Sequence, residues 1–196
     1  MTESFFGLLA DVTLPEALER LVALKPRGAD KGMPLVLPER AAWKALVREL
    51  PSGASALADA FWPGGLSVAL RAAPSLDRRV TLDERVAVRL PGASPAASLT
   101  RAYGRPLTAT SANRSGEPPA TTADAVLGSF PSAVEDGSLT VWRDARAEAP
   151  GGLPSTVVVF DAGRAWIARD GAVPRTSVLE VLERAGVLLD DSGPHR

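Results

Sequence analysis

Two segments far apart in the sequence carry side chains that could bind an anion. Residues 107–118 begin as a short apolar run and end in hydroxyls, an amide, a guanidinium and a glycine. Residues 24–32 carry Lys25, Arg27 and Lys31, where a predicted helix ends in a turn that contains glycine. Cations, hydroxyls and the backbone amides of such turns bind phosphate oxygens. The two segments together predict a phosphate site.

The composition excludes several other kinds of chemistry. The chain has no cysteine, which removes disulfides, thiolate nucleophiles and zinc-thiolate sites. Its one histidine, His195, is next to last, which excludes a Ser-His-Asp triad and argues against a histidine metal site. The net charge of −1 gives no overall attraction to nucleic acid or to an anionic membrane, so any polyanion must bind a local patch. The remaining polar groups are suited to binding and orienting anions.

Length and hydropathy predict one compact domain. With 196 residues, 45% of them hydrophobic, the chain can bury a sizeable core, and we expect a single domain over residues 1–188 with a disordered tail over 189–196. No apolar run approaches the roughly 20 residues of a membrane span. The first residues, Met-Thr-Glu-Ser-Phe-Phe, lack the basic start of a signal peptide. We therefore expect a cytoplasmic protein with no membrane partner.

Helix and strand signals alternate along the chain. Thr13, Pro15 and Glu16 are typical of a capping box, which predicts a helix that ends near Lys25. Further helices are expected over 38–51, 94–104, a short segment after residue 122, and 176–185, and strands over 33–37, 66–70, 86–90, 106–110, 155–160 and 165–169. Residues 72–84 are predicted to be an exposed loop, and residues 161–164 a turn. The alternation favours an α/β sheet with helices on its faces.

Seven short motifs occur in the order found in one known family. They are Thr2-Glu3-Ser4-Phe5-Phe6-Gly7-Leu8; Lys25-x-Arg27 with Asp30-Lys31-Gly32; Phe61-Trp62-Pro63-Gly64; Val86-Ala87-Val88-Arg89-Leu90-Pro91; Thr110-Ser111-Ala112-Asn113-Arg114-Ser115-Gly116; Pro154-Ser155-Thr156-Val157; and Arg169-Asp170-Gly171. Each is weak by itself, but seven in order make chance implausible. Over roughly residues 2–171 the chain resembles the YrdC-type threonylcarbamoyl-adenylate (threonylcarbamoyl-AMP) synthases. The resemblance implies a twisted open sheet of mixed parallel and antiparallel strands.

The resemblance also implies a reaction and the residues that perform it. ATP, L-threonine and bicarbonate would give threonylcarbamoyl-adenylate and pyrophosphate, for the threonylcarbamoyladenosine of tRNA. Catalytic roles would fall to Lys25, Arg27, Ser111 and Asn113, which with Arg169 would face the ATP. Arg89 would clamp the threonine carboxylate, and Thr2 and Ser155 would complete that pocket. We expect Mg²⁺ with the ATP and no metal site made by the protein alone.

Two expectations about geometry accompany these roles. Lys25 is expected to be exposed near its helix end, and its side chain is expected to converge with Ser111 and Arg169 in a positively charged cleft. The family has a helix and a strand before the first motif, with a proline where Met1 stands here. We therefore expect an upstream segment, if one is restored, to raise both stability and activity.

Each motif also has an ordinary structural interpretation. Lys25 and Arg27 fit a helix end that favours cations, Ser111 and Asn113 fit a turn, and Ser155 fits a strand. Arg89 would then pair with a structural carboxylate, because an unpaired buried guanidinium is costly. Two alternative functions are a non-catalytic module that binds double-stranded RNA or tRNA, and an enzyme that passes a carbamoyl adenylate to another acceptor. For the synthase, the expected partners are the downstream tRNA threonylcarbamoyl transferase proteins.

Overall fold

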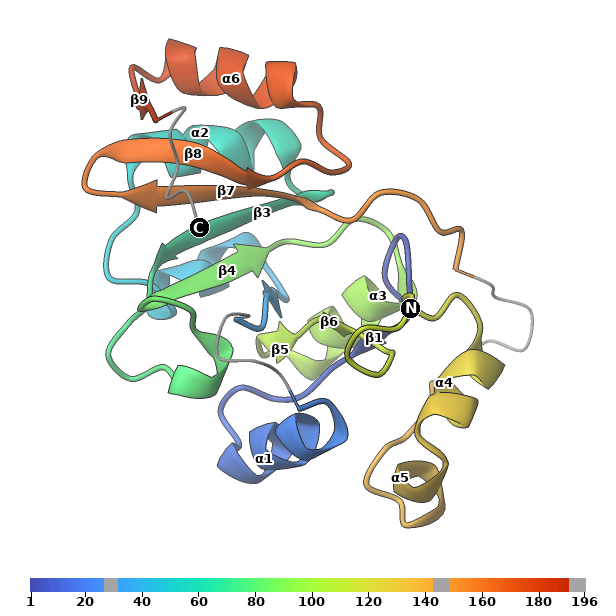
Figure 1. Cartoon of the computed structure of the whole chain (residues 1–196). Helices are drawn as coiled ribbons and strands as arrows, with labels where there is room; N and C mark the ends of the chain where they lie inside the picture. The colour runs from blue at the N-terminus through green and yellow to red at the C-terminus, as the bar shows by residue number, and fades with distance from the viewer. Residues whose placement is uncertain (27–31, 143–148, 191–196) are drawn as a thin grey trace.

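A mixed sheet organises the chain, and its strands follow the order β5-β2-β4-β3-β7-β8-β9 (Figure 1). The computed structural model describes residues 1–26, 32–142 and 149–190. The strands are β2 (Leu35–Val36), β3 (Leu66–Arg71), β4 (Arg85–Arg89), β5 (Leu107–Thr108), β7 (Thr156–Asp161), β8 (Arg164–Arg169) and β9 (Leu188–Leu189). The pairs β2–β4, β3–β7 and β8–β9 are parallel, whereas β3–β4, β2–β5 and β7–β8 are antiparallel. The predicted fold class, a mixed α/β sheet, is confirmed.

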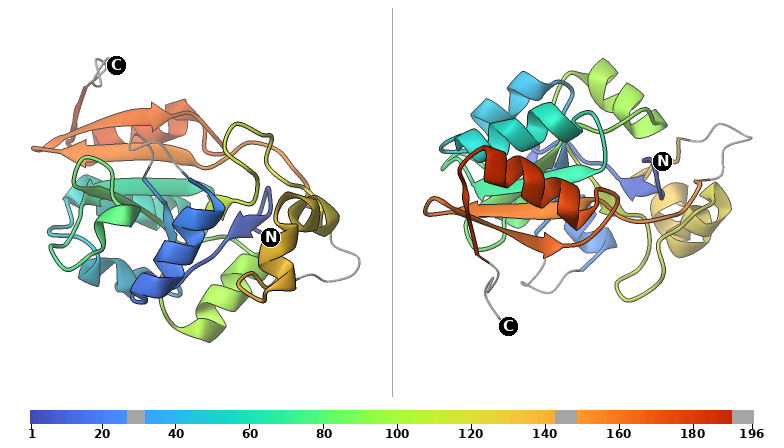
Figure 2. Two further views of the ribbon diagram at one scale, coloured as in Figure 1. Left: turned by 60° about the horizontal axis from the view of Figure 1, so that its bottom comes forward. Right: turned by 90° about the horizontal axis from the view of Figure 1, so that it is seen from above.

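A small second sheet and the helices surround this sheet. β1 (Gly7–Leu8) pairs antiparallel with β6 (Thr110–Ser111). The helices are α1 (Pro15–Leu24), α2 (Ser52–Phe61), α3 (Pro95–Tyr103), α4 (Ala123–Ser129), α5 (Pro131–Glu135) and α6 (Arg175–Arg184), with short 3₁₀ helices η1 (Arg40–Ala45) and η2 (Arg78–Val80). Figure 2 shows α2 and α6 near one end of the molecule and α4 and α5 at the other.

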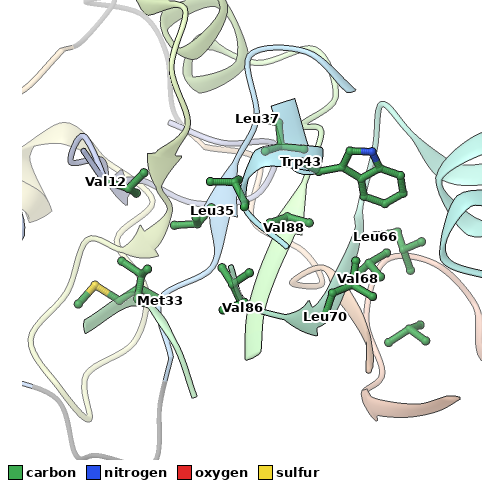
Figure 3. Close-up of a cluster of buried hydrophobic side chains, with 14 of the residues drawn as sticks. Val12, Met33, Leu35, Leu37, Trp43, Leu66, Val68, Leu70, Val86 and Val88 are labelled. Atoms are coloured by element: carbon green, nitrogen blue, oxygen red, sulfur yellow. The ribbon is translucent and has the colours of Figure 1, made fainter. Parts of the chain in front are cut away.

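The hydrophobic core packs against the central strands β2, β4 and β3. The burial of alternate residues in β4 shows which face of the sheet Arg89 points to. Figure 3 shows buried side chains of β2, β4 and β3 lying side by side on the sheet, with Trp43 beside them. In β4, Val86 and Val88 are fully buried, and successive side chains of a strand point to opposite faces. Arg89 therefore points to the other face of the sheet, away from Val88.

Helix ends follow the predicted capping in two cases and not in a third. The Ser94 hydroxyl accepts a hydrogen bond from the Ala97 amide at 3.2 Å, and α3 ends at Gly104, whose φ of 76° suits glycine. The Thr122 hydroxyl likewise caps α4. The capping box at Thr13 is wrong, because the Thr13 hydroxyl donates to Asp11 at 2.7 Å instead. The helix nevertheless begins at Pro15, as expected.

The predicted helix over residues 38–51 is wrong. That segment contains only the short η1, and Pro51 precedes α2, which the sequence analysis missed. Proline fits at a helix start, where its missing N–H costs nothing. Within α2, Gly53 packs so closely that an added Cβ would lie 2.4 Å from the Val187 side chain. The missing side chain of Gly53 therefore lets α2 pack closely against Leu182 of α6 and against Val187.

Three other boundaries differ from the prediction. Residues 72–84 include η2 with its buried Val80, so this segment is not simply an exposed loop. The strand predicted over 106–110 is divided, because β5 pairs with β2 whereas β6 pairs with β1. Leu189, which was assigned to the tail, belongs to β9, and the Asp190 amide donates to the Ala165 carbonyl at 2.9 Å. Residues 191–196 lie outside the described residues, and the single domain over 1–188 stays a prediction.

Candidate functional site

The two segments singled out in the sequence meet in space. Lys25 directly follows α1, and its Nζ lies 2.6 Å from the Ser111 carbonyl oxygen and 3.0 Å from Ser111 Oγ. The same Nζ donates to Asn113 Oδ1 at 2.7 Å. The predicted convergence of Lys25 with Ser111 is therefore confirmed. We call Lys25, Ser111 and Asn113 the lysine group.

Lys25 is buried, which corrects the expectation that it is exposed. The residue is 6% exposed. An ammonium can be buried when polar atoms replace the water around it, and the oxygens of Ser111 and Asn113 do so here. Lys25 therefore helps to hold α1 against the loop after β6, in addition to carrying charge.

Asn113 is fixed by the loop around it. Its Nδ2 donates to the Arg114 carbonyl at 3.1 Å and also to the Glu117 carbonyl. Ser115, which the sequence analysis did not select, donates from its hydroxyl to the Pro26 carbonyl at 2.7 Å and joins the two segments a second time. Asn113 thus orients Lys25, and its direct contact with ATP stays a prediction. Arg27 lies outside the described residues.

Arg89 has a carboxylate partner. Its Nη2 lies 3.0 Å from Glu3 Oε2, and Glu3 Oε1 accepts a hydrogen bond from the Gly92 amide at 2.7 Å. The side chains of Arg89 and Glu3 are 13% and 26% exposed, so the pair is largely shielded from water. Arg89 thus has the structural carboxylate partner that the alternative interpretation of this residue predicted. Sequence reasoning quoted Glu3 in a motif but did not select it, although a carboxylate next to Thr2 was the available signal.

Arg169 is held against Ser155. Its Nε and Nη2 donate to the Ser155 carbonyl at 3.0 and 2.8 Å, and Nη2 also donates to Ser155 Oγ at 3.0 Å. Ser155 Oγ lies 2.9 Å from Ser67 Oγ on β3. A bulge in the β7–β8 register places Arg169 opposite Val157, which brings it to the start of β7. We call Glu3, Arg89, Ser155 and Arg169 the arginine group.

Gly171 allows this close approach of two chain segments. A Cβ at this position would lie 2.3 Å from the Pro154 carbonyl oxygen, so any other residue would push the segments apart. The neighbouring Ala172 amide donates to the same carbonyl at 2.8 Å. Packing thus explains why glycine stands at the last position of the motif Arg169-Asp170-Gly171.

The arginine group has an excess of positive charge. Burial lowers the pKa of the Arg169 guanidinium from its ordinary value, and the nearby charge of Arg89 lowers it further. The group thus contains two guanidiniums, of Arg89 and Arg169, and one carboxylate, of Glu3. The geometry therefore favours a bound anion beside these two arginines.

Thr2 has its hydroxyl engaged in a turn. The hydroxyl donates to the Phe5 carbonyl at 2.8 Å and accepts from the Phe5 amide at 3.3 Å. This turn places Glu3 on Arg89, and a few residues later Gly7 pairs with Ser111 in the small sheet. Residues 2–8 thus join the arginine group to the lysine group. The contact of Thr2 with a ligand stays a prediction.

Two apolar cavities lie beside β1 rather than at these groups. The larger, of about 360 Å³, is lined mainly by aliphatic side chains of α1 and α3, and the smaller, of about 130 Å³, continues toward Val141 and Trp142. Aliphatic walls cannot replace the hydration of a polyanion. The candidate anion site is therefore the polar groups, and not either cavity.

The described residues, 1–26, 32–142 and 149–190, bear on metal binding and membrane spanning. In these ranges, no three His, Cys, Asp or Glu side chains are arranged to hold a metal ion. None of the helices in the same ranges has the length and apolar character to cross a membrane.

The mixed sheet and its flanking helices define an α/β protein, and the lysine and arginine groups are its candidate anion site. The model of the Sua5/YciO/YrdC family, described as "Telomere recombination", matches residues 1–171. The chain belongs to this family, as the seven motifs predicted.

Relatives of known name support the same assignment. The chain is 32% identical to the threonylcarbamoyl-AMP synthase of Pyrococcus abyssi over 186 residues, which are 92% of this chain and 52% of that protein. It is 35% identical to the threonylcarbamoyl-AMP synthase of Sodalis glossinidius over 135 residues, or 67% of this chain and 71% of that protein. The chain thus spans about half the length of the Pyrococcus relative.

Solved structures share the fold. The structure of Pyrococcus abyssi Sua5 complexed with L-threonine matches with a TM-score of 0.83 and 29% identity, covering 97% of this chain and 54% of that one. Escherichia coli YciO matches with a TM-score of 0.68 and 16% identity, covering 89% of this chain and 82% of that one, which supports the fold alone.

Proposed function

We propose that this chain is a threonylcarbamoyl-adenylate synthase that uses ATP, L-threonine and bicarbonate and releases pyrophosphate. The observation that carries the proposal is that residues 2–8 join the arginine group to the lysine group, which could hold an amino-acid carboxylate and a nucleotide phosphate side by side. Family membership and relatives named threonylcarbamoyl-AMP synthase support the same reaction.

In this proposal the arginine group binds the threonine. Arg89 donates a two-bond fork to the carboxylate, and Ser155 adds a hydroxyl contact. Glu3 holds the Arg89 side chain by one nitrogen, Nη2. The relative solved with L-threonine supports the choice of amino acid.

The lysine group and Arg169 would bind the phosphates of ATP. Lys25 and Ser111 contact the phosphate oxygens, and Asn113 orients Lys25. The family resemblance assigns Arg27 to the same site as a second cation. Arg169, beside Arg89, neutralises charge where the two substrates meet. Mg²⁺ would arrive bound to the phosphates of ATP.

These residues suit a reaction without a protein nucleophile. The threonine amine and bicarbonate form a carbamate with loss of water. A carbamate oxygen then attacks the α-phosphorus, its new bond to phosphorus forms, and the bond to the pyrophosphate oxygen breaks. Catalysis of such a transfer comes mainly from positioning and from neutralising charge on phosphate oxygens, which lysine, arginine and hydroxyls supply. The mixed anhydride product would then pass to tRNA threonylcarbamoyl transferase proteins.

A substrate-omission assay tests the proposal. The purified chain with Mg²⁺ is expected to release pyrophosphate when ATP, L-threonine and bicarbonate are all present, and carbon from labelled bicarbonate should appear in an adenylate identified by mass spectrometry. Arg184→Lys, a change at an exposed α6 residue, is the control for substitutions of site arginines. Pyrophosphate release that is independent of threonine, or no labelled adenylate, would contradict the proposal.

A further inference from the structure

A buried serine that the sequence analysis did not select lies next to the arginine group. Ser67 on β3 is 2% exposed, and its Oγ lies 2.9 Å from Ser155 Oγ. β3 pairs with β4 so that Val68 lies opposite Val88, and continuing this antiparallel register places Ser67 opposite Arg89. Ser67 thus lies under the residues that we assign to the threonine carboxylate.

The direction of the hydrogen bonds in this cluster can be worked out. Arg169 can only donate, so Ser155 Oγ accepts from Arg169 Nη2. Ser67 is buried, and Ser155 Oγ is the acceptor that the described residues place within reach of its hydroxyl. If Ser67 did not donate to Ser155, its hydrogen would be buried without an acceptor, which is unfavourable. Ser67 therefore donates to Ser155.

This direction determines what Ser155 can do. Its oxygen accepts from both Arg169 and Ser67, so its own hydrogen is not used by either of them. Ser155 is partly exposed, so this hydrogen can point toward solvent or a ligand. A hydroxyl held in this way presents a donor and no readily available acceptor.

We propose that Ser67 is a positioning residue that commits the Ser155 hydroxyl to donate to a carboxylate oxygen of the amino-acid substrate. The inference rests on the proposed function. Together with the guanidinium of Arg89, it makes this side of the site a set of donors, which selects an ionised carboxylate over an amide or an alcohol. Ser67 itself does not touch the substrate.

A double-mutant cycle on threonine binding tests this role. Ser67→Ala, Ser155→Ala and the double variant are compared with the unchanged chain by calorimetric titration of L-threonine, with melting temperatures recorded for each. We expect Ser67→Ala to weaken binding roughly threefold to tenfold, the range of one uncharged hydrogen bond. In the Ser155→Ala background the same change should have no further effect. Ser98→Ala, at an exposed serine of α3, should bind as the unchanged chain does.

A second ligand separates positioning from a general structural effect. 1-Aminopropan-2-ol is threonine without its carboxylate, so Ser67→Ala should leave its binding unchanged. Restoring the hydroxyl with Ser67→Thr should recover most of the threonine affinity. Equal binding of L-threonine by the unchanged chain and Ser67→Ala, or additive effects of Ser67→Ala and Ser155→Ala, would overturn the inference alone. A folded, unchanged chain that does not bind L-threonine would overturn the proposed function, and this inference with it.

Discussion

The lysine group and the arginine group hold their cations by different means. Lys25 donates to uncharged oxygens of β6 and of the loop that follows it, whereas Arg89 pairs with the carboxylate of Glu3 and lies near a second guanidinium. The position of Lys25 depends on the closing of a loop, and the positions of Arg89 and Arg169 depend on the register of sheet strands. We infer that the lysine group mainly serves ATP and its reaction, and that the arginine group mainly serves the choice of amino acid.

The largest effect is expected for Lys25→Ala. Loss of a donor to phosphate oxygens costs about 3 kcal/mol in the transition state, or about a hundredfold in the rate of pyrophosphate release. Because Lys25 is buried and ties α1 to the Ser111 loop, the variant should also melt at a lower temperature. The rates are compared at temperatures where both proteins are folded, and Lys44→Ala, at an exposed lysine, is the control. An unchanged turnover would remove Lys25 from the proposed mechanism.

Arg89→Lys should affect threonine far more than ATP. An ammonium cannot form the two-bond fork of a guanidinium, and charge-assisted hydrogen bonds of this kind contribute about 1.5–3 kcal/mol. We expect the KM for threonine to rise about tenfold or more, with little change in the KM for ATP. Steady-state titration of each substrate measures both values, with Arg184→Lys as the control. Equal rises would show that Arg89 serves the fold rather than the amino acid.

Two serine variants test the division of labour directly. Ser111→Ala should raise the KM for ATP, and Ser155→Ala the KM for threonine, each by roughly threefold to tenfold for one lost hydrogen bond. The two changes are chemically identical, so the two variants are controls for each other. The comparison between the groups fails if both serines change the same substrate's KM.

Glu3→Gln examines the charge that distinguishes the arginine group. The amide can still accept from the Gly92 amide, but it cannot neutralise Arg89. Because this ion pair is largely shielded, we expect the free energy of unfolding in urea to fall by about 1 kcal/mol. Asp59→Asn, which breaks the exposed pair with Arg40, should cost less. If the two variants lose the same free energy of unfolding, shielding from water does not strengthen the Glu3–Arg89 ion pair.

The smallest expected effect lies outside both groups, at Asp11. Burial raises the pKa of this carboxyl, but hydrogen bonds from Thr13, Tyr103 and Arg105 outweigh burial and hold the pKa below its ordinary value. A lowered pKa contributes stability above the ordinary value of about 3.8, and this stability is lost as the pH falls through the lower folded value. Asp11→Asn should therefore reduce the slope with which stability falls as the pH drops below the ordinary carboxyl pKa of about 3.8, without changing either KM. An unchanged slope would contradict this account of Asp11.

Several elements were predictable because their signals are local. Ser94, Thr122 and Gly104 mark helix ends through hydrogen bonds and dihedral angles within a few residues of each other. The hairpin of β7 and β8 follows from two apolar runs joined by a short turn. By contrast, α2 was missed because its Gly53 makes sense only against Val187, far along the chain.

The site shows the same division between local and distant information. The sequence by itself determined the family, the mixed α/β class, and the residue types of an anion site, because ordered motifs, periodicity and composition are properties of the chain alone. Only the tertiary structure decided that Lys25 is buried on Ser111, that Glu3 neutralises Arg89, and that Ser67 lies under Ser155. These contacts join residues that are 86 or more positions apart, so they depend on sheet order and register, which local sequence signals do not specify.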